Sequence, residues 1–82
     1  MGRHSNRRAR IVFYDVAQEQ IQQMSPADQA RLEPVLDVIA SNPTIGVLSK
    51  NASYREYRHG GVRVLYVPTA LGTLVLVAYV EA

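Results

Sequence analysis

Residues 54–66 of this 82-residue sequence read Tyr54-Arg55-Glu56-Tyr57-Arg58-His59-Gly60-Gly61-Val62-Arg63-Val64-Leu65-Tyr66. Two runs rich in tyrosine, valine, leucine and arginine flank a pair of glycines, and such runs separated by a short glycine-containing loop are typical of a β-hairpin. The stretch is also the densest run of cationic and aromatic side chains in the chain. It therefore predicts both the centre of the fold and the place of the chemistry.

Two loop lengths are compatible with this hairpin. A loop made of the two glycines alone places Arg58 opposite Arg63, and like charges directly across a ladder are unfavourable. A three-residue loop that includes His59 avoids this contact and places Tyr57 opposite Arg63. We therefore expect the three-residue loop. Because side chains alternate along a strand, this loop would cluster Arg55, Tyr57 and Arg63 on one face of the sheet.

The hydrophobic pattern upstream of the hairpin changes from strand to helix. Residues 10–14 are rich in β-branched and aromatic side chains and predict a first strand. A helical stripe covers residues 16–24, with Asp15 as its expected N-cap. The stretch Ser25-Pro26-Ala27-Asp28 begins a second helix, because it combines a serine N-cap with proline at the first helical position. The apolar face of this helix consists of Leu32, Val35, Leu36 and Ile39.

Two prolines bear on the length of the second helix. Pro34 lies inside it and predicts either a kink or two shorter helices, since proline removes one backbone hydrogen bond. Asn42-Pro43 ends the helix, because the residue before a proline avoids helical geometry. Residues 44–51 then form a connecting loop that leads into the hairpin.

The last apolar run covers residues 73–80 and follows a turn at residues 68–72. It is apolar on both faces, which is typical of an interior strand covered on both sides. The pattern as a whole predicts an α+β fold of order β-α-α-β-β-β, with a mostly antiparallel four-stranded sheet and both helices on one face. We expect residues 10–82 to form this single domain and residues 1–9 to form a flexible basic arm.

Composition excludes several classes of protein. The sequence has no cysteine and only two histidines, His4 and His59, so neither a disulfide framework nor a metal site is predicted. No apolar run is long enough to span a bilayer, and the N-terminus lacks the apolar core of a signal peptide, which indicates a cytoplasmic protein that does not bind membranes.

The net charge of +2 conceals an uneven distribution. Residues 1–14 carry four arginines and no acid, residues 15–42 carry five acids and one arginine, and residues 43–82 carry four basic residues and two acids. This distribution predicts acidic helices and a basic sheet. A cationic face of this kind attracts phosphate backbones even on a nearly neutral protein.

The hairpin resembles that of the RelE/ParE superfamily, the toxins of bacterial type II toxin–antitoxin modules. The resemblance rests on Tyr54-Arg55-Glu56-Tyr57-Arg58, the glycine turn, Val62-Arg63-Val64-Leu65-Tyr66, and the helical pair that ends at Asn42-Pro43; it covers most of residues 10–80. It implies a small toxin that a cognate antitoxin neutralises, with no cofactor.

In the ribonuclease branch of this family, the 2′-hydroxyl of the RNA attacks the neighbouring phosphate while basic side chains stabilise the pentavalent state. The resemblance therefore implies a toxin that inhibits translation by cleaving mRNA on the ribosome, without a metal. Arg63 matches the strand arginine of the family, and Arg55 falls near a basic residue of the first hairpin strand. With Tyr57, these are the candidate catalytic residues. The candidate nucleic-acid-binding residues are Arg10, Lys50, Arg58 and His59.

Two alternatives stay open. One is a ParE-like toxin that acts by binding DNA gyrase, and the other is a catalytically degenerate binding module that keeps only the fold and the antitoxin interface. Some residues also have purely structural explanations: Tyr66 and Tyr79 are expected in the core with the hydroxyl at its rim, and Arg58 either pairs with Glu56 or lies in solvent.

Overall fold

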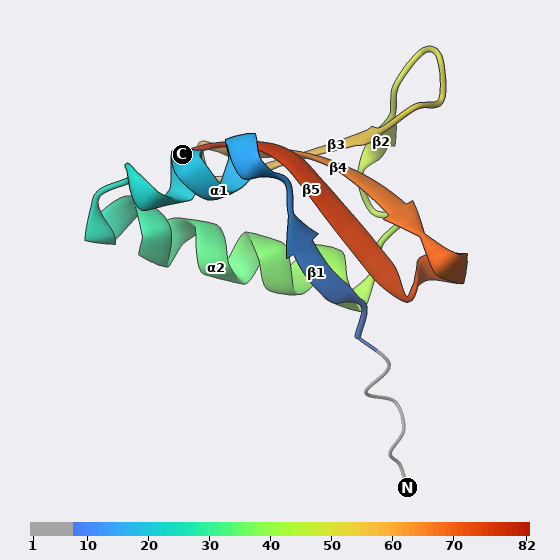
Figure 1. The fold of residues 1–82 in the computed structure, drawn as a ribbon, viewed down its shortest axis with the longest axis horizontal. Coiled ribbons are helices and arrows are strands. Elements are labelled where there is room, and N and C mark those ends of the chain that lie inside the picture. The colour runs from blue at the N-terminus through green and yellow to red at the C-terminus, as the bar shows by residue number, and fades with distance from the viewer. Residues whose placement is uncertain (1–7) are drawn as a thin grey trace, which may run out of the picture.

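The computed structural model describes residues 8–82 of the chain. Its elements are β1 (Arg10–Phe13), α1 (Asp15–Gln22), α2 (Pro26–Ser41), β2 (Val47–Leu48), β3 (Arg55–His59), β4 (Val62–Thr69), the short 3₁₀ helix η2 (Ala70–Gly72) and β5 (Leu74–Glu81). The strands form one sheet in the order β1-β5-β4-β3-β2. Figure 1 shows the two helices beside the sheet. The loop between β2 and β3 projects from the end of the molecule that lies away from α1 (Figure 1).

The sheet confirms the predicted α+β class and its mostly antiparallel character. Strand β1 pairs with β5 in parallel, whereas all other neighbours are antiparallel. The sheet has five strands and not the predicted four, because two residues of the expected connecting loop form β2 and pair with β3. A two-residue strand is too short to produce a recognisable alternation, so the sequence pattern could not reveal it.

Both helices pack against one face of the sheet. Their buried side chains meet those of β4 and β5 in a core whose members are at most 3% exposed: Ala17, Leu32, Val35, Ile39, Val62, Val64, Tyr66, Val75, Val77 and Val80. Burial of one such aliphatic side chain stabilises the fold by about 1.5–3 kcal/mol. Within residues 8–82, no helix covers the opposite face, which we call the open face.

The helix boundaries follow the predicted signals closely. The Ser25 hydroxyl caps α2 by accepting a hydrogen bond from the Asp28 backbone N–H at 3.1 Å. The expected N-cap of α1 is wrong by one residue, because Tyr14 occupies the cap position and Asp15 lies in the first turn. A carboxylate in the first turn still interacts favourably with the positive end of the helix dipole.

Helix α2 runs unbroken through Pro34 and ends before the predicted stop at Asn42-Pro43. Of the two predicted alternatives, a kink or two shorter helices, the second is therefore wrong. Pro34 and Ala30 are both exposed, so the carbonyl that loses its N–H partner lies on the solvent side, where water can bind it. A single interior proline is tolerated on this side because the apolar face of the helix stays buried.

The predicted basic arm falls largely outside the described residues, since residues 1–7, including His4, are not among them. The last two residues of that arm contact α2. Arg8 Nη2 lies 2.7 Å from Asp37 Oδ1, and the Ala9 N–H donates to the Ala40 carbonyl at 2.8 Å. Among residues 8–82, none of the helices has the length and apolar character needed to cross a membrane.

The hairpin register differs from the prediction. Arg58 pairs with Arg63 and His59 with Val62, so the loop consists of Gly60 and Gly61 alone. Both glycines have positive φ, +59° and +83°, as a two-residue hairpin turn that matches the strand twist requires. The predicted three-residue loop is wrong because the repulsion between the two arginines is relieved by a carboxylate, described below.

Candidate functional site

The open face carries a polar network that extends over three neighbouring strands. Two cross-strand rows form it: Arg58, Arg63 and Glu81 in one row, and Glu56, Leu65 and Tyr79 in the next. Each row takes one residue from β3, one from β4 and one from β5. The network therefore has five polar members around a single leucine, and its geometry is set by the sheet rather than by loops.

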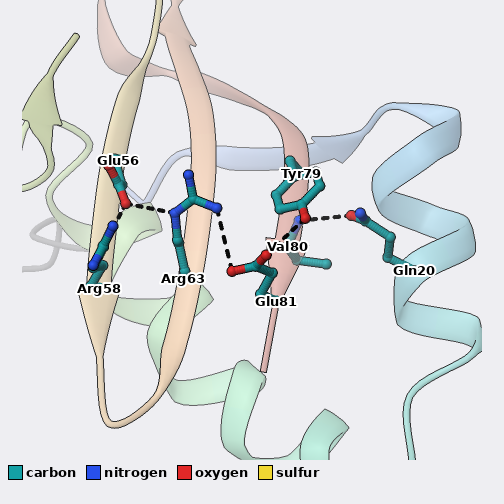
Figure 2. A network of polar contacts seen from close by, with 7 residues as sticks. All are labelled: Gln20, Glu56, Arg58, Arg63, Tyr79, Val80 and Glu81. Atoms are coloured by element: carbon teal, nitrogen blue, oxygen red, sulfur yellow. Dashed lines mark hydrogen bonds and ion pairs between the residues drawn. The ribbon is translucent and has the colours of Figure 1, made fainter.

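Arg63 is the centre of this network (Figure 2). Its Nε donates to Glu56 Oε2 at 2.7 Å, and its Nη1 donates to Glu81 Oε1 at 3.3 Å. Its Cζ lies 5.6 Å from the centroid of the Tyr79 ring, within the range of a cation–π contact. The side chain of Arg63 is still 32% exposed, so its guanidinium is reachable from solvent.

The two glutamates complete the network. Glu56 Oε2 accepts a second hydrogen bond, from Arg58 Nε at 2.6 Å, which confirms the structural explanation given for Arg58. Glu56 thus lies between the two cross-strand arginines and offsets their repulsion. Glu81 accepts from the Tyr79 hydroxyl through Oε2 at 2.8 Å.

A β-bulge places Tyr79 and Glu81 on the open face. Leu65 pairs with Tyr79 but Tyr66 pairs with Val77, so Ala78 is the extra residue of β5. Before the bulge Val75 and Val77 face the core, and after it Val80 does, so the alternation is reversed at this point. Bulges of this kind re-aim side chains and are frequent beside functional sites.

Helix α1 supports the strand end beyond the bulge. The side-chain oxygen Oε1 of Gln20 accepts a hydrogen bond from the Val80 backbone N–H at 2.8 Å (Figure 2). The contact satisfies a backbone donor on a stretch of β5 that β1 does not reach. It holds the segment that carries Tyr79 and Glu81 in place.

The ion pairs shift the protonation equilibria of the network. Hydrogen bonds from Arg58 and Arg63 lower the pKa of Glu56, and the hydrogen bond from Tyr79 lowers the pKa of Glu81. In return, Glu56 raises the pKa of Arg63, and Glu81 raises the pKa of Tyr79. At neutral pH the network therefore holds two guanidinium groups, two carboxylates and a neutral phenol.

The predicted cluster of Arg55, Tyr57 and Arg63 is not formed. In the observed register Arg55 pairs with Tyr66 and Tyr57 with Val64, both core residues, so these two side chains lie on the helix side of the sheet while Arg63 lies on the open face. The cause is the one-residue difference in loop length, since a one-residue slip changes which residues share a face.

Arg55 and Tyr57 make structural contacts in these positions. Arg55 Nη1 donates to the carbonyls of Gly46 at 2.7 Å and Thr44 at 3.2 Å, and so holds the segment before β2 against the sheet. Tyr57 packs against the core and stacks on His59, with ring centroids 6.5 Å apart. Their catalytic roles stay predictions.

Tyr66 is the core tyrosine that the sequence indicated. It is fully buried, and its hydroxyl donates to the Pro43 carbonyl at 2.8 Å and accepts from the Gly46 N–H at 2.9 Å. Burial raises its pKa. Gly46 is packed so tightly that a Cβ there would lie 2.8 Å from this hydroxyl.

The predicted nucleic-acid-binding residues are spread over the molecule. Arg58 belongs to the network, and Lys50 lines a shallow groove of about 300 Å³ that Glu56 and Tyr54 also line. His59 lies on the helix side and lines a separate apolar groove of about 490 Å³ between α2 and β3. Arg10 pairs with Leu74 on the far part of β5, roughly 20 Å along the sheet from Arg63 by strand geometry.

Sequence reasoning missed three members of the network. It treated Glu56 only as a partner of Arg58 and Tyr79 only as a core residue, and it assigned nothing to Glu81. Alternation along the strand places Glu56 and Arg58 on the same face. Choosing the two-residue loop would also have placed Arg63 on that face, next to both of them. For Tyr79 and Glu81 no such signal exists, because the bulge is not evident in an apolar run. Within residues 8–82, no three histidine, aspartate or glutamate residues are grouped to hold a metal ion.

Comparison with solved structures identifies the fold. A chain of the toxin–antitoxin complex RelBE2 from Mycobacterium tuberculosis superimposes with a TM-score of 0.75 and 20% sequence identity, covering 90% of this chain and 96% of that one. The isolated E. coli RelE toxin gives a TM-score of 0.74 at 17% identity, over 87% of this chain and 80% of that one. This chain has the RelE fold.

The intact E. coli RelBE toxin–antitoxin complex is similar in the same way, with a TM-score of 0.69 at 17% identity over 87% of this chain and 92% of that one. No protein-family model matches the sequence. No curated protein matches it significantly either. The fold that the hairpin resemblance implied is therefore confirmed by shape rather than by sequence, and in this RelE fold Arg63 is the centre of the open-face network.

Proposed function

We propose that this chain is the toxin of a type II toxin–antitoxin pair, and that it inhibits translation by cleaving mRNA. The observation that carries the proposal is the open-face network, in which a partly exposed arginine contacts two ionised carboxylates and a tyrosine on a sheet of the RelE fold. These side-chain types are the ones that a phosphodiester-cleaving site without a metal needs.

Arg63 is the group that would bind the scissile phosphate. A guanidinium presents a planar fork of donors that matches two phosphate oxygens, and it strengthens its hold as charge develops on them in the transition state. Arg58 stands beside it on the neighbouring strand, and its side chain is 71% exposed. An incoming phosphate exchanges with Glu56 and Glu81 for the same donors, which costs little because these ion pairs are partly solvated.

An antitoxin is the partner that this surface fits. Apolar side chains are exposed along the sheet edge next to the network, among them Val47 at 75%, Leu48 at 48% and Tyr54 at 40%. A partner segment that covers this edge and places acidic side chains against Arg58 and Arg63 would bury apolar area and block the network together. Neutralisation follows from occupancy of the site.

The second candidate is a toxin of the same fold that binds a protein target such as DNA gyrase without nuclease chemistry. The charge balance of the network favours it. Arg58 and Arg63 are matched by Glu56 and Glu81, so the open face attracts a phosphate backbone less than the predicted basic sheet would. A network with both signs of charge can instead pair with a protein surface that also carries both signs.

Expression of the chain in a bacterial host, without a partner, separates the two candidates. We expect growth arrest, an early fall in amino-acid incorporation into protein, and unchanged plasmid supercoiling. The Arg63→Ala variant should abolish the arrest, whereas Arg8→Ala, which removes an exposed ion pair with Asp37 elsewhere on the molecule, should keep it. Plasmid relaxation before any loss of protein synthesis would support the gyrase-binding candidate instead.

A further inference from the structure

We propose that Glu56 is the general base of the cleavage reaction, the group that takes the proton from the attacking 2′-hydroxyl. The inference rests on the proposed ribonuclease function and adds a catalytic residue to the same site. It depends on the position of the carboxylate, on which of its oxygens is engaged, and on the groove beside it.

The two oxygens of Glu56 differ. Arg58 and Arg63 both donate to Oε2. The other oxygen, Oε1, accepts no hydrogen bond from any of residues 8–82. One oxygen is thus held by two phosphate-binding arginines while the other has its lone pairs available. An ionised carboxylate with a free oxygen beside the phosphate donors is what proton abstraction from a 2′-hydroxyl requires.

Glu81 provides an internal comparison. It also contacts Arg63, yet Oε1 accepts from that arginine and Oε2 accepts from the Tyr79 hydroxyl. Both of its oxygens are engaged, and its side chain is 50% exposed against 28% for Glu56. The two carboxylates therefore contact the same arginine but differ in their free oxygens. Of the two, only Glu56 has an oxygen that is free to act as a base.

The groove beside Glu56 gives the nucleotide a place to lie. Tyr54, Lys50 and Glu56 line it together, at a volume of about 300 Å³. A tyrosine ring can stack on an unpaired base, and a lysine can bind the next phosphate. Because Glu56 both lines this groove and contacts Arg63, a strand of RNA that runs from the groove onto Arg63 would pass beside Glu56.

The reaction balances with the groups named. The 2′-hydroxyl proton passes to Glu56, the O2′–P bond forms and the P–O5′ bond breaks. The leaving O5′ takes a proton from solvent water, and the hydroxide that remains takes the proton back from Glu56. The products are a 2′,3′-cyclic phosphate and a 5′-hydroxyl end. When Arg58 and Arg63 turn to the phosphate, Glu56 loses two stabilising hydrogen bonds and becomes a stronger base.

The test compares variants in a translation reaction programmed with one defined mRNA. Glu56→Gln keeps the shape of the side chain and removes its basicity, so it should lower the single-turnover cleavage rate by about 10²–10⁴-fold. Its affinity for the same mRNA with 2′-deoxy sugars at the cleavage site should match or exceed that of the wild type, because a negative charge beside the phosphates is gone. Glu33→Gln, an exposed carboxylate of α2, should cleave at the wild-type rate.

The pH dependence provides a second readout. The wild-type rate should fall on the acid side as Glu56 becomes protonated, with Arg58 and Arg63 as the charged groups that face it, and Glu56→Gln should lack this acid limb. Cleavage by Glu56→Gln at the wild-type rate, an equal loss in Glu81→Gln, or a parallel loss of affinity would overturn the assignment. If the wild type itself leaves the mRNA intact, the proposed ribonuclease function fails, and the assignment of Glu56 fails with it.

Folding of the variant is controlled by a conservative change. Glu56→Asp keeps the charge but withdraws the oxygens by one methylene group, which should lower the cleavage rate at least about tenfold while keeping the acid limb. Unchanged cleavage by a folded Glu56→Asp protein, checked by circular dichroism, would contradict a role in proton transfer.

Discussion

At the scale of single residues, the site is defined by what each side chain touches rather than by its charge. Arg55 and Arg63 are eight positions apart in sequence and both lie on the hairpin. Arg55 holds the carbonyls of Gly46 and Thr44, whereas Arg63 lies between two glutamates on the open face. The carbonyl contacts give Arg55 a purely structural explanation. Arg63 has no such backbone contact within residues 8–82, which leaves its guanidinium available to a ligand.

Tyr66 should contribute to stability and not to activity. The Tyr66→Phe change removes the partner of the buried Gly46 N–H and of the partly buried Pro43 carbonyl. An unsatisfied buried group costs about 1–3 kcal/mol, so we expect the free energy of unfolding to fall by about that amount in urea titrations. The matched control is Tyr14→Phe, an exposed tyrosine, which should change it little; equal values for the two variants would contradict the buried network.

The glutamates of the network predict how stability depends on pH. The folded-state pKa values of Glu56 and Glu81 lie below the ordinary value of 4.5, so their contribution is present above that value and is lost as the pH falls through the folded pKa. The free energy of unfolding should therefore be level near neutral pH and decline below about pH 4.5. Denaturant titrations of wild type and Glu56→Gln measure this. A variant that declines as steeply as the wild type would show that other groups cause the effect.

At the scale of elements, the sequence predicted most of what depends on periodicity and local capping, although it misplaced the cap of α1 by one residue. The first strand, the Ser25 cap, the stop at Asn42-Pro43 and the hairpin were all predictable, because each needs only neighbouring residues. The register of the hairpin was not, since the repulsion between Arg58 and Arg63 is offset by Glu56, whose effect depends on the register itself. The bulge at Ala78 was hidden in an apolar run, and with it the placement of Tyr79 and Glu81.

The two-glycine turn can be tested directly. Gly61 has φ of +83° and a Cβ there would lie 2.8 Å from Arg31 Nη2, so Gly61→Ala should lower the free energy of unfolding by roughly 1–2 kcal/mol. Gly60→Asn is the matched variant, because Asn-Gly is a preferred pair for this turn and the space around Gly60 is open. Urea unfolding of both proteins decides the matter. A destabilised Gly60→Asn with an unaffected Gly61→Ala would contradict the observed register.

At the scale of the whole molecule, one face of the sheet is covered by helices and the other carries the network. With 82 residues the chain has a small core, and domains of this size gain only a modest margin of stability on their own. A partner on the open face would both add stability and block the network. The proposed toxin and antitoxin are in this sense coupled through a single surface.

Binding of the antitoxin should raise the apparent stability of this chain. A ligand that binds only the folded state, at a thousandfold excess over its dissociation constant, adds about 4 kcal/mol. We expect a polypeptide encoded beside this chain to raise its melting temperature in proportion to the logarithm of its concentration. The rise should be smaller for a double variant, Val47→Asp with Leu48→Asp, which places charges on the exposed sheet edge. A melting temperature that ignores the neighbouring polypeptide would argue against the pairing.

The central claim is that the open face around Arg63 cuts RNA, and the most direct measurement maps the ends of cellular mRNA after the chain is expressed. Wild type should produce new 5′-hydroxyl ends within coding regions, matched by 2′,3′-cyclic phosphate ends on the upstream fragments. Arg63→Ala should lower their yield by about 10²–10³-fold, the usual loss for one transition-state donor, and keep a folded circular-dichroism spectrum. Growth arrest by the wild type with no new mRNA ends, or equal cleavage by folded Arg63→Ala, would contradict the account.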